Sequence, residues 1–233
     1  MTYPDGVDPA SLQSLEQVNR LVAECRACPR LVEWREQVAQ EKRAAFADWQ
    51  YWGRPVPGFG DPAASIVIVG LAPAAHGANR TGRMFTGDRS GDFLYAALHR
   101  VGLANQPTSV ARDDGLRLSG VWITAPVRCA PPANKPTPGE RDRCRPWFQA
   151  DLRLVPWRVA VVLGSFGYAA LARAVELRPR PKFAHGLEVE LGDGRWLVGS
   201  YHVSQQNTFT GKLTEPMLDA VFDRARAIAG TTL

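Results

Sequence analysis

The sequence predicts an α/β fold with an open, mostly parallel sheet and helices on both of its faces. Short uninterrupted apolar runs alternate with segments whose apolar residues recur at helical spacing, which is typical of strand, loop and helix units around a parallel sheet. Apolar residues make up 45% of the 233 residues and charged residues 22%, so the chain can bury an ordinary core rather than stay disordered. One domain spanning residues 1–233 is expected at this length.

The N-terminal part, residues 11–50, is expected to form a helical extension that a bend at "ACPRL" interrupts. Residues 51–62, "YWGRPVPGFGDP", are rich in Pro and Gly and read as a connector. The expected strands that follow are "SIVIVG", "GVWITAPV", "RVAVVLG" and two within "LEVELGDGRWLVGSY". The expected helices are "GDFLYAALHRVGL", one from Thr137 with a capping box to Glu140, "SFGYAALARAVE" and Glu215 to Ala229.

Three loops that follow strands are rich in Gly, Pro, Asn, Thr and Arg, and each of the first and third contains His. They are residues 70–88, "GLAPAAHGANRTGRMFTGD", residues 128–138, "RCAPPANKPTP", and residues 202–214, "HVSQQNTFTGKLT". In an open α/β sheet ligands bind outside the carboxyl ends of the strands. We therefore expect the three loops to form one cleft. The first loop lacks the fingerprints of nucleotide-binding loops.

Three side chains in these loops have both a functional and a structural interpretation. A base could stack on Phe85, or its ring could fold into the core. Asp88 could orient a water molecule, or it could cap the next helix. His202 follows a strand in a loop with Ser204 and Asn207, and is either functional or structural. Among the other histidines, His76 competes with it for the site.

The cysteines are Cys25 and Cys28 in a C-x-x-C pair, and Cys129 and Cys144, which lie far from that pair in the sequence. Four thiolates from two segments could hold zinc or an iron–sulfur cluster, and four unlinked buried thiols are the alternative. A zinc ribbon more usually has two C-x-x-C pairs, so the loose spacing of the second pair disfavours zinc.

The charge balance favours a polyanionic partner. The formal net charge is +5, and only four of the 28 basic residues are Lys. Arg binds phosphate in a bidentate manner and stacks on flat rings, which suits nucleic acid, although an Arg-rich composition without a ligand explains the same numbers. No secretory signal and no apolar run of membrane-spanning length is visible, so a cytoplasmic protein without a membrane partner is expected.

Taken together, the three loop motifs and the four cysteines resemble the family 5 uracil-DNA glycosylases, from about Cys25 to the last helix. This resemblance implies a three-layer α/β/α sandwich around a mostly parallel central sheet. It implies a monofunctional DNA repair hydrolase that removes uracil, hypoxanthine and other deaminated bases from DNA by base flipping, and a monomer is expected. It also implies a structural 4Fe-4S cluster, held by Cys25, Cys28, Cys129 and Cys144.

The resemblance further implies roles for residues of the three loops. Asp88 and Asn134 are expected to hold the water or the base, and His202 to lie against the base. The other implied substrate-binding residues are Gly70, Ala72, Ala74, Phe85, Ala125 and Asn207. The implied DNA-binding residues are Arg80, Arg83 and Lys212 as phosphate contacts on the rim, with Gln206 and Phe209 filling the emptied base stack.

Two departures from related patterns bear on specificity. Family 4 enzymes have Asn at the position of Ala125, and losing that side chain implies broad substrate choice. The third motif reads His-Val-Ser from His202 where His-Pro-Ser is usual. Without the proline, the loop is expected to be less rigid. An inactive DNA-binding protein with an iron–sulfur centre and an enzyme acting on free nucleotides are the two alternatives.

Overall fold

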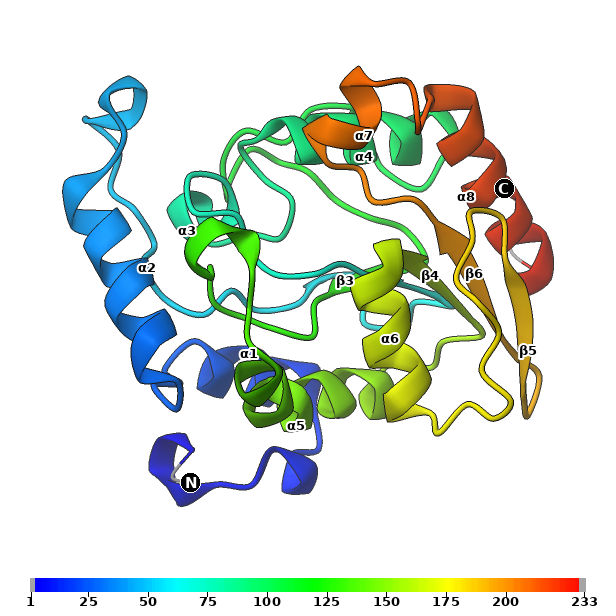
Figure 1. Ribbon diagram of the computed structural model, residues 1–233, viewed down its shortest axis with the longest axis horizontal. Coiled ribbons are helices and arrows are strands. Elements are labelled where there is room, and N and C mark those ends of the chain that lie inside the picture. The colour runs from blue at the N-terminus through cyan, green and yellow to red at the C-terminus, as the bar shows by residue number, and fades with distance from the viewer. Residues whose placement is uncertain (1–2, 231–233) are drawn as a thin grey trace.

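The computed structural model describes residues 3–230, and within them the chain forms a six-stranded sheet in the order β1-β3-β2-β4-β6-β5 (Figure 1). The strands are β1 (Phe59–Gly60), β2 (Ile66–Val69), β3 (Val121–Thr124), β4 (Val159–Leu163), β5 (Glu188–Gly192) and β6 (Arg195–Ser200). The four central strands are parallel, and β1 and β5 join the two edges antiparallel. The predicted α/β class with a mostly parallel sheet is confirmed.

Helices cover both faces of the sheet. The helices are α1 (Leu15–Val22), α2 (Pro29–Glu41), α3 (Ala78–Thr81), α4 (Arg89–Arg100), α5 (Pro138–Leu154), α6 (Gly164–Ala174), α7 (Gln205–Phe209) and α8 (Glu215–Ala229). Residues of α4 and α8 pack on one face of the sheet in one hydrophobic cluster. Residues of α1, α5 and α6 pack on the other face in a second cluster. The arrangement is therefore three layers, as Figure 1 shows.

The central strands are short apolar runs because both of their faces are covered. Every residue of β2, β3 and β4 is buried, so side chains on alternate positions enter the two clusters in turn. Ile66 and Ile68 belong to the first cluster, whereas Val67 and Val69 belong to the second. This two-sided burial is what a parallel sheet between two helical layers requires.

The helix ends follow local sequence signals. The predicted capping box is present at the start of α5, where the Thr137 side chain accepts a hydrogen bond from the Glu140 amide and the Glu140 side chain accepts one from the Thr137 amide. Asp88 caps α4 by accepting a hydrogen bond from the Gly91 amide at 3.0 Å. The cap interpretation of Asp88 is thus correct, and it fixes where the carboxylate lies.

Several short elements differ from the prediction. The expected helical stretch 11–50 is divided into a 3-10 turn at Pro9–Ser11, α1, α2 and a 3-10 turn at Ala44–Phe46, with the first cysteine pair between α1 and α2. The two-residue strand β1 lies in the expected connector. The short helices α3 and α7 lie in two of the expected loops. Each has too few residues to show a periodic pattern.

Within the described part of the chain, no helix is both long and apolar enough to cross a membrane.

Candidate active site

A cavity of about 430 Å³ lies at the carboxyl end of the sheet and is lined by all three predicted loops. Its walls come from the segment after β2, the segment after β3 and the segment after β6, which parallel strands bring to the same edge. Because the three loops are expected to hold a base, we call it the base pocket. Its lining residues are Leu71, Ala72, Pro73, Ala74, Ala78, Met84, Phe85, Asp88, Ser90, Ala125, Ala133, Asn134, His202, Ser204 and Gln206.

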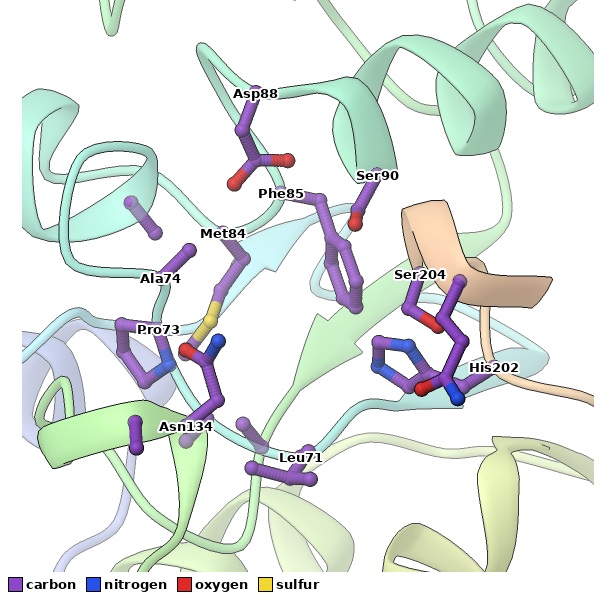
Figure 2. Close-up of a pocket in the computed structure, with 15 residues that line it drawn as sticks. Leu71, Pro73, Ala74, Met84, Phe85, Asp88, Ser90, Asn134, His202 and Ser204 are labelled. Carbon is purple, nitrogen blue, oxygen red and sulfur yellow. The ribbon is translucent and has the colours of Figure 1, made fainter. Parts of the chain in front are cut away.

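Three polar side chains of the base pocket come from the three different loops. Figure 2 shows Asp88, Asn134 and His202 turned toward the space between them, with the ring of Phe85 on the side of His202. The ring centroids of Phe85 and His202 are 6.4 Å apart. Few polar groups in an otherwise apolar cavity are typical of a small-molecule site in which a flat ring is oriented.

Asp88 is held in place from two sides. Its Oδ1 accepts the Gly91 hydrogen bond at the first turn of α4. Its Oδ2 lies over Gly77, where a Cβ atom would be only 2.0 Å away, so a side chain at residue 77 would displace the carboxylate. Burial raises the pKa of Asp88 above its ordinary value, against the lowering effect of the Gly91 amide.

His202 lies directly after β6 and packs against the turn that follows β4. Gly164 has φ +85°, and a Cβ atom there would lie 3.1 Å from the Cβ of His202. Burial lowers the pKa of His202 to about 4, so the imidazole is neutral at pH 7. The side chain of Asn207 donates a hydrogen bond to the His202 carbonyl at 2.8 Å. Asn207 therefore supports the loop and does not line the base pocket.

Asn134 is placed by its backbone rather than by burial. Ala133 and Asn134 have φ of +52° and +56°, and Asn134 is exposed although it lines the base pocket. Left-handed backbone at two successive residues is uncommon outside glycine, and strained positions of this kind cluster at functional sites.

The remaining predicted substrate residues divide into two groups. Ala72, Ala74, Phe85 and Ala125 line the base pocket. Gly70 does not line it, but a Cβ atom there would lie 2.8 Å from the Phe85 ring, so this glycine makes room for the ring.

The structure corrects the expectation that Arg80 and Arg83 lie on the rim. Both are only 3% exposed. The Arg80 side chain donates hydrogen bonds to the carbonyls of His76 and Gly87, both at 2.8 Å. The Arg83 guanidinium pairs with both carboxylate oxygens of Asp114, each at 2.8 Å. Both side chains thus brace the loop from within, and neither is free to meet a phosphate.

Asp114 is a partner of this loop that the sequence analysis did not single out. Burial by itself favours the neutral acid, but hydrogen bonds from Arg83 and from the amides of Leu116, Val110 and Ala111 hold the pKa of Asp114 well below its ordinary value. The Asp114 carboxylate therefore fixes a turn against the first loop. The contact with the first loop is made through Arg83, 31 residues away in the sequence, so no local sequence signal indicates it.

The predicted contacts on the third loop lie at the surface. Gln206 is exposed and lines the base pocket. Phe209 at the end of α7 is 74% exposed, although it is a large apolar side chain. Lys212 is exposed and its Nζ lies 4.8 Å from the centre of the Tyr201 ring. Met84 and Ser90 line the pocket although the sequence analysis did not select them.

The four cysteines line one small cavity of about 20 Å³, which we call the cysteine cavity. Cys129 accepts a hydrogen bond from Arg35 at 3.0 Å, and Cys144 accepts one from the Arg128 amide at 3.3 Å. Burial raises the pKa of Cys129 to about 12. Within residues 3–230, no three His, Cys, Asp or Glu side chains are grouped closely enough to hold a metal ion.

Comparison with known proteins gives a consistent result. The family model of the uracil DNA glycosylase superfamily matches residues 57–226. The type-5 uracil-DNA glycosylase of Mycobacterium tuberculosis is 59% identical over 93% of this chain and 82% of its own length. The enzyme of the same name from Thermus thermophilus is 55% identical over 88% of this chain and 94% of its own. That from Pyrobaculum aerophilum is 47% identical over 91% and 92%. Since these matches extend over most of its length, the chain belongs to the type-5 uracil-DNA glycosylases of the uracil DNA glycosylase superfamily.

Proposed function

We propose that this protein is a monofunctional DNA repair glycosylase that hydrolyses the N-glycosidic bond of uracil in DNA, and that of hypoxanthine and other deaminated bases. The observation that carries the proposal is the base pocket, in which Asp88, Asn134 and His202 from three loops meet in an apolar cavity of about 430 Å³. The names of the relatives agree with uracil in DNA as the substrate.

The target base has to leave the duplex to enter the pocket. Extruding a nucleotide costs a few kcal/mol and is cheapest at mismatched pairs such as uracil opposite guanine. The exposed Gln206 and Phe209 lie on the third loop, at or beyond the rim of the pocket. We assign them to the space that the extruded base leaves in the stack.

Bond cleavage leaves negative charge on the departing base and positive charge on the sugar. A neutral His202 can donate the one N–H of its ring to the departing base, and preorganised donors are often the largest catalytic contribution. Water then attacks the sugar carbon. Asp88 is the candidate to position that water and to accept a proton from it, because its carboxylate is fixed against α4 and lines the pocket. Asn134 is the candidate to contact the base or the water from the opposite wall.

The wall at Ala125 supports broad substrate choice. This residue is 2% exposed and lines the pocket with a methyl group. A site that hydrogen-bonds its substrate rejects analogues far better than an apolar one does. An apolar wall therefore admits bases that differ in their edge groups.

We assign a 4Fe-4S cluster to the cysteine cavity on the chemistry of its donors, although the described cysteines do not form a group that would hold a single metal ion. Its donor set is four sulfurs, and N–H groups of Arg35 and Arg128 already point at two of them, as expected around a cluster whose sulfurs carry negative charge. Cys25, Cys28, Cys129 and Cys144 would hold the cluster, which would supply a covalent link between the N-terminal helices and the β3 segment. No chemical step is assigned to it.

The direct test is base release. Purified protein is incubated with an end-labelled duplex that carries one uracil opposite guanine, and alkali then converts abasic sites into strand breaks. We expect cleavage at uracil, and also in a parallel duplex with hypoxanthine. An intact strand under conditions where the protein binds the duplex would instead support a DNA-binding protein without activity. Competition by free deoxyuridine nucleotides but not by DNA would support an enzyme of free nucleotides.

A further inference from the structure

A second cavity, of about 720 Å³, runs on from the base pocket. Ala74, Asp88 and Asn134 line both cavities, so the two share a boundary. We call the second cavity the side groove. One of its walls is the segment that follows α2, which rises beyond the end of that helix in light blue at the upper left of Figure 1. None of the predicted site residues other than Ala74, Arg80, Asp88 and Asn134 lines it.

The first wall of the side groove presents two aromatic rings that rest on a buried cation. The guanidinium carbon of Arg80 lies 3.8 Å from the centre of the Phe46 ring and 4.1 Å from that of Trp49. Both rings stay partly exposed and line the groove. Arg80 is 3% exposed, and its Nη1 has no hydrogen-bond partner within the described residues. The guanidinium is attracted to both rings, so it helps to hold them in place where they line the groove.

This aromatic wall is held in a defined position. α2 ends at Glu41, and the next residue, Lys42, has a φ of 56° that turns the chain sharply. The Lys42 ammonium group donates a hydrogen bond to the Ala47 carbonyl at 2.8 Å. The Phe46 and Trp49 rings meet edge to face with their centroids 6.2 Å apart. The segment therefore presents its rings in a fixed arrangement rather than as a loose loop.

Val110, which is 56% exposed, also lines the side groove. The turn that bears it is fixed by Asp114, which accepts a hydrogen bond from the Val110 amide at 2.8 Å. It is also joined to the first loop, because the Gly87 amide donates to the Ser109 carbonyl at 2.9 Å. An apolar side chain is thus held in solvent by a rigid turn, facing the groove.

Cations stand at the edges of the side groove. Arg43 and Arg89 are exposed and line it, and they are partly balanced by Asp92. Rings for stacking together with Arg side chains at the rim are the features with which proteins hold unpaired nucleotides.

We propose that the side groove binds the nucleotide adjacent to the excised one in the same strand. Its base packs between the rings of Phe46 and Trp49 and the side chain of Val110, and its phosphate lies near Arg43 or Arg89. This inference rests on the proposed function, because the base pocket fixes where the strand begins. Stacking on aromatic rings tolerates any base, so the site would grip the strand without reading its sequence.

The test combines an enzyme variant with a substrate variant. Duplexes with uracil opposite guanine are made with an intact neighbour, or with a tetrahydrofuran residue, which keeps the phosphate but lacks the base, on the 5′ or the 3′ side. For wild type we expect kcat/KM to fall about 5- to 150-fold when the base is missing on one of the two sides. On intact DNA, the kcat/KM of Trp49→Leu should lie below that of wild type by a similar factor. Removing the neighbouring base should then lower the kcat/KM of Trp49→Leu little further.

Two variants serve as controls. Trp49→Phe keeps a ring and should restore most of the activity. Trp52→Leu also removes a ring that contacts an arginine, since Arg112 lies 4.5 Å from the centre of the Trp52 ring. Trp52 lines a different groove, so the kcat/KM of this variant should fall on the tetrahydrofuran substrate by the same factor as that of wild type. Thermal unfolding of each variant separates loss of fold from loss of the contact.

The outcomes distinguish the two proposals. If wild type and Trp49→Leu lose the same factor on both tetrahydrofuran substrates, the side groove does not hold the neighbouring base. If wild type fails to release uracil from the intact duplex, the proposed function itself is wrong.

Discussion

The base pocket and the cysteine cavity lie on either side of one segment, yet they are built in opposite ways. The segment after β3 contributes Ala125 and Asn134 to the base pocket. Val127 and Cys129, which lie between those two residues in the sequence, line the cysteine cavity. The base pocket is roomy, with a few polar groups in an apolar lining. The cysteine cavity is about 20 Å³ and is lined by the four cysteines, apolar residues and two arginines. The same stretch of backbone therefore lines both cavities.

Asn134 is held in position although its side chain is exposed, because both ends of its segment are fixed. Asn134 is exposed, whereas Cys129, five residues earlier, is 8% exposed and receives a hydrogen bond from Arg35. At the other end of the segment, Glu140 is fixed by Arg30 through two hydrogen bonds of 2.7 Å. Asn134 is thus held between two fixed points. If the cysteine cavity anchors this segment, substitutions in the cysteine cavity should disturb the base pocket as well. Substitutions in the base pocket should leave the cysteine cavity unchanged.

The largest effect is expected from breaking the anchor. If the cysteine cavity holds the proposed cluster, Cys129→Ala should abolish it and with it the stable fold, because the binding free energy of a structural metal site is folding free energy. Iron and sulfide content, visible absorption and thermal unfolding measure this directly. A Cys129→Ala protein that unfolds at the wild-type temperature would contradict the anchoring role.

The next largest effect is expected at Asp88, and it should leave the anchor untouched. Asp88→Asn keeps an oxygen that can cap α4 through the Gly91 amide, but removes the carboxylate charge. If Asp88 activates the water, single-turnover uracil release should slow by roughly 10²- to 10⁴-fold. The unfolding temperature and the iron content should stay at wild-type values. Asn134→Ala, measured in parallel, shows which of the two side chains the water depends on, and an unchanged rate in Asp88→Asn would exclude that residue.

A smaller effect concerns stability and pH in the base pocket. The pKa of His202 is about 4 in the folded protein and about 6.5 for an exposed histidine, so below pH 6.5 the unfolded chain binds a proton that the folded chain does not. The free energy of unfolding should therefore fall as pH drops from about 6.5 to about 4, by at most about 1.4 kcal/mol per pH unit from this group.

Urea unfolding of wild type and His202→Gln at pH 7, 6 and 5 measures that contribution. Burial also lowers the pKa values of His76 and His185, so the wild-type slope contains their share and only the difference between the two proteins belongs to His202. If the free energy of unfolding depends on pH equally in both proteins, the imidazole of His202 is not held in its neutral form by burial.

The smallest effect is expected from adding a polar group to the apolar wall. Ala125→Asn would offer uracil a donor and an acceptor, and we expect the ratio of kcat/KM for uracil over hypoxanthine to rise by about tenfold, as one hydrogen bond allows. Initial rates on the two duplexes give this ratio. A ratio that does not change would show that the base edge does not face residue 125.

The sequence predicts the central architecture well because the physical signals there are local. Fully apolar strands such as β2 and the capping box at Thr137 follow from neighbouring residues, and the rule for parallel sheets brings the three loops together. Short elements such as β1 and α3 escape prediction because two to four residues carry no period.

The roles of the loop arginines depend on partners that are distant in the sequence. Arg83 is buried because Asp114, 31 residues further on, meets it. Arg80 is buried because the rings of Phe46 and Trp49 cover it. The loop sequence is equally compatible with a rim contact and with an internal brace. The choice between them is made by tertiary contacts, which periodicity and composition do not report.

The two antiparallel edge strands also bear on how the protein behaves at high concentration. β1 has only two residues, and β5 alternates exposed Glu188 and Glu190 with half-buried apolar residues before its register shifts toward Gly192. Very short edges, edge charges and bulges are the devices by which sheets avoid pairing with the edge of another molecule. The central parallel strands, which are apolar on both faces, are thereby kept from serving as templates for aggregation.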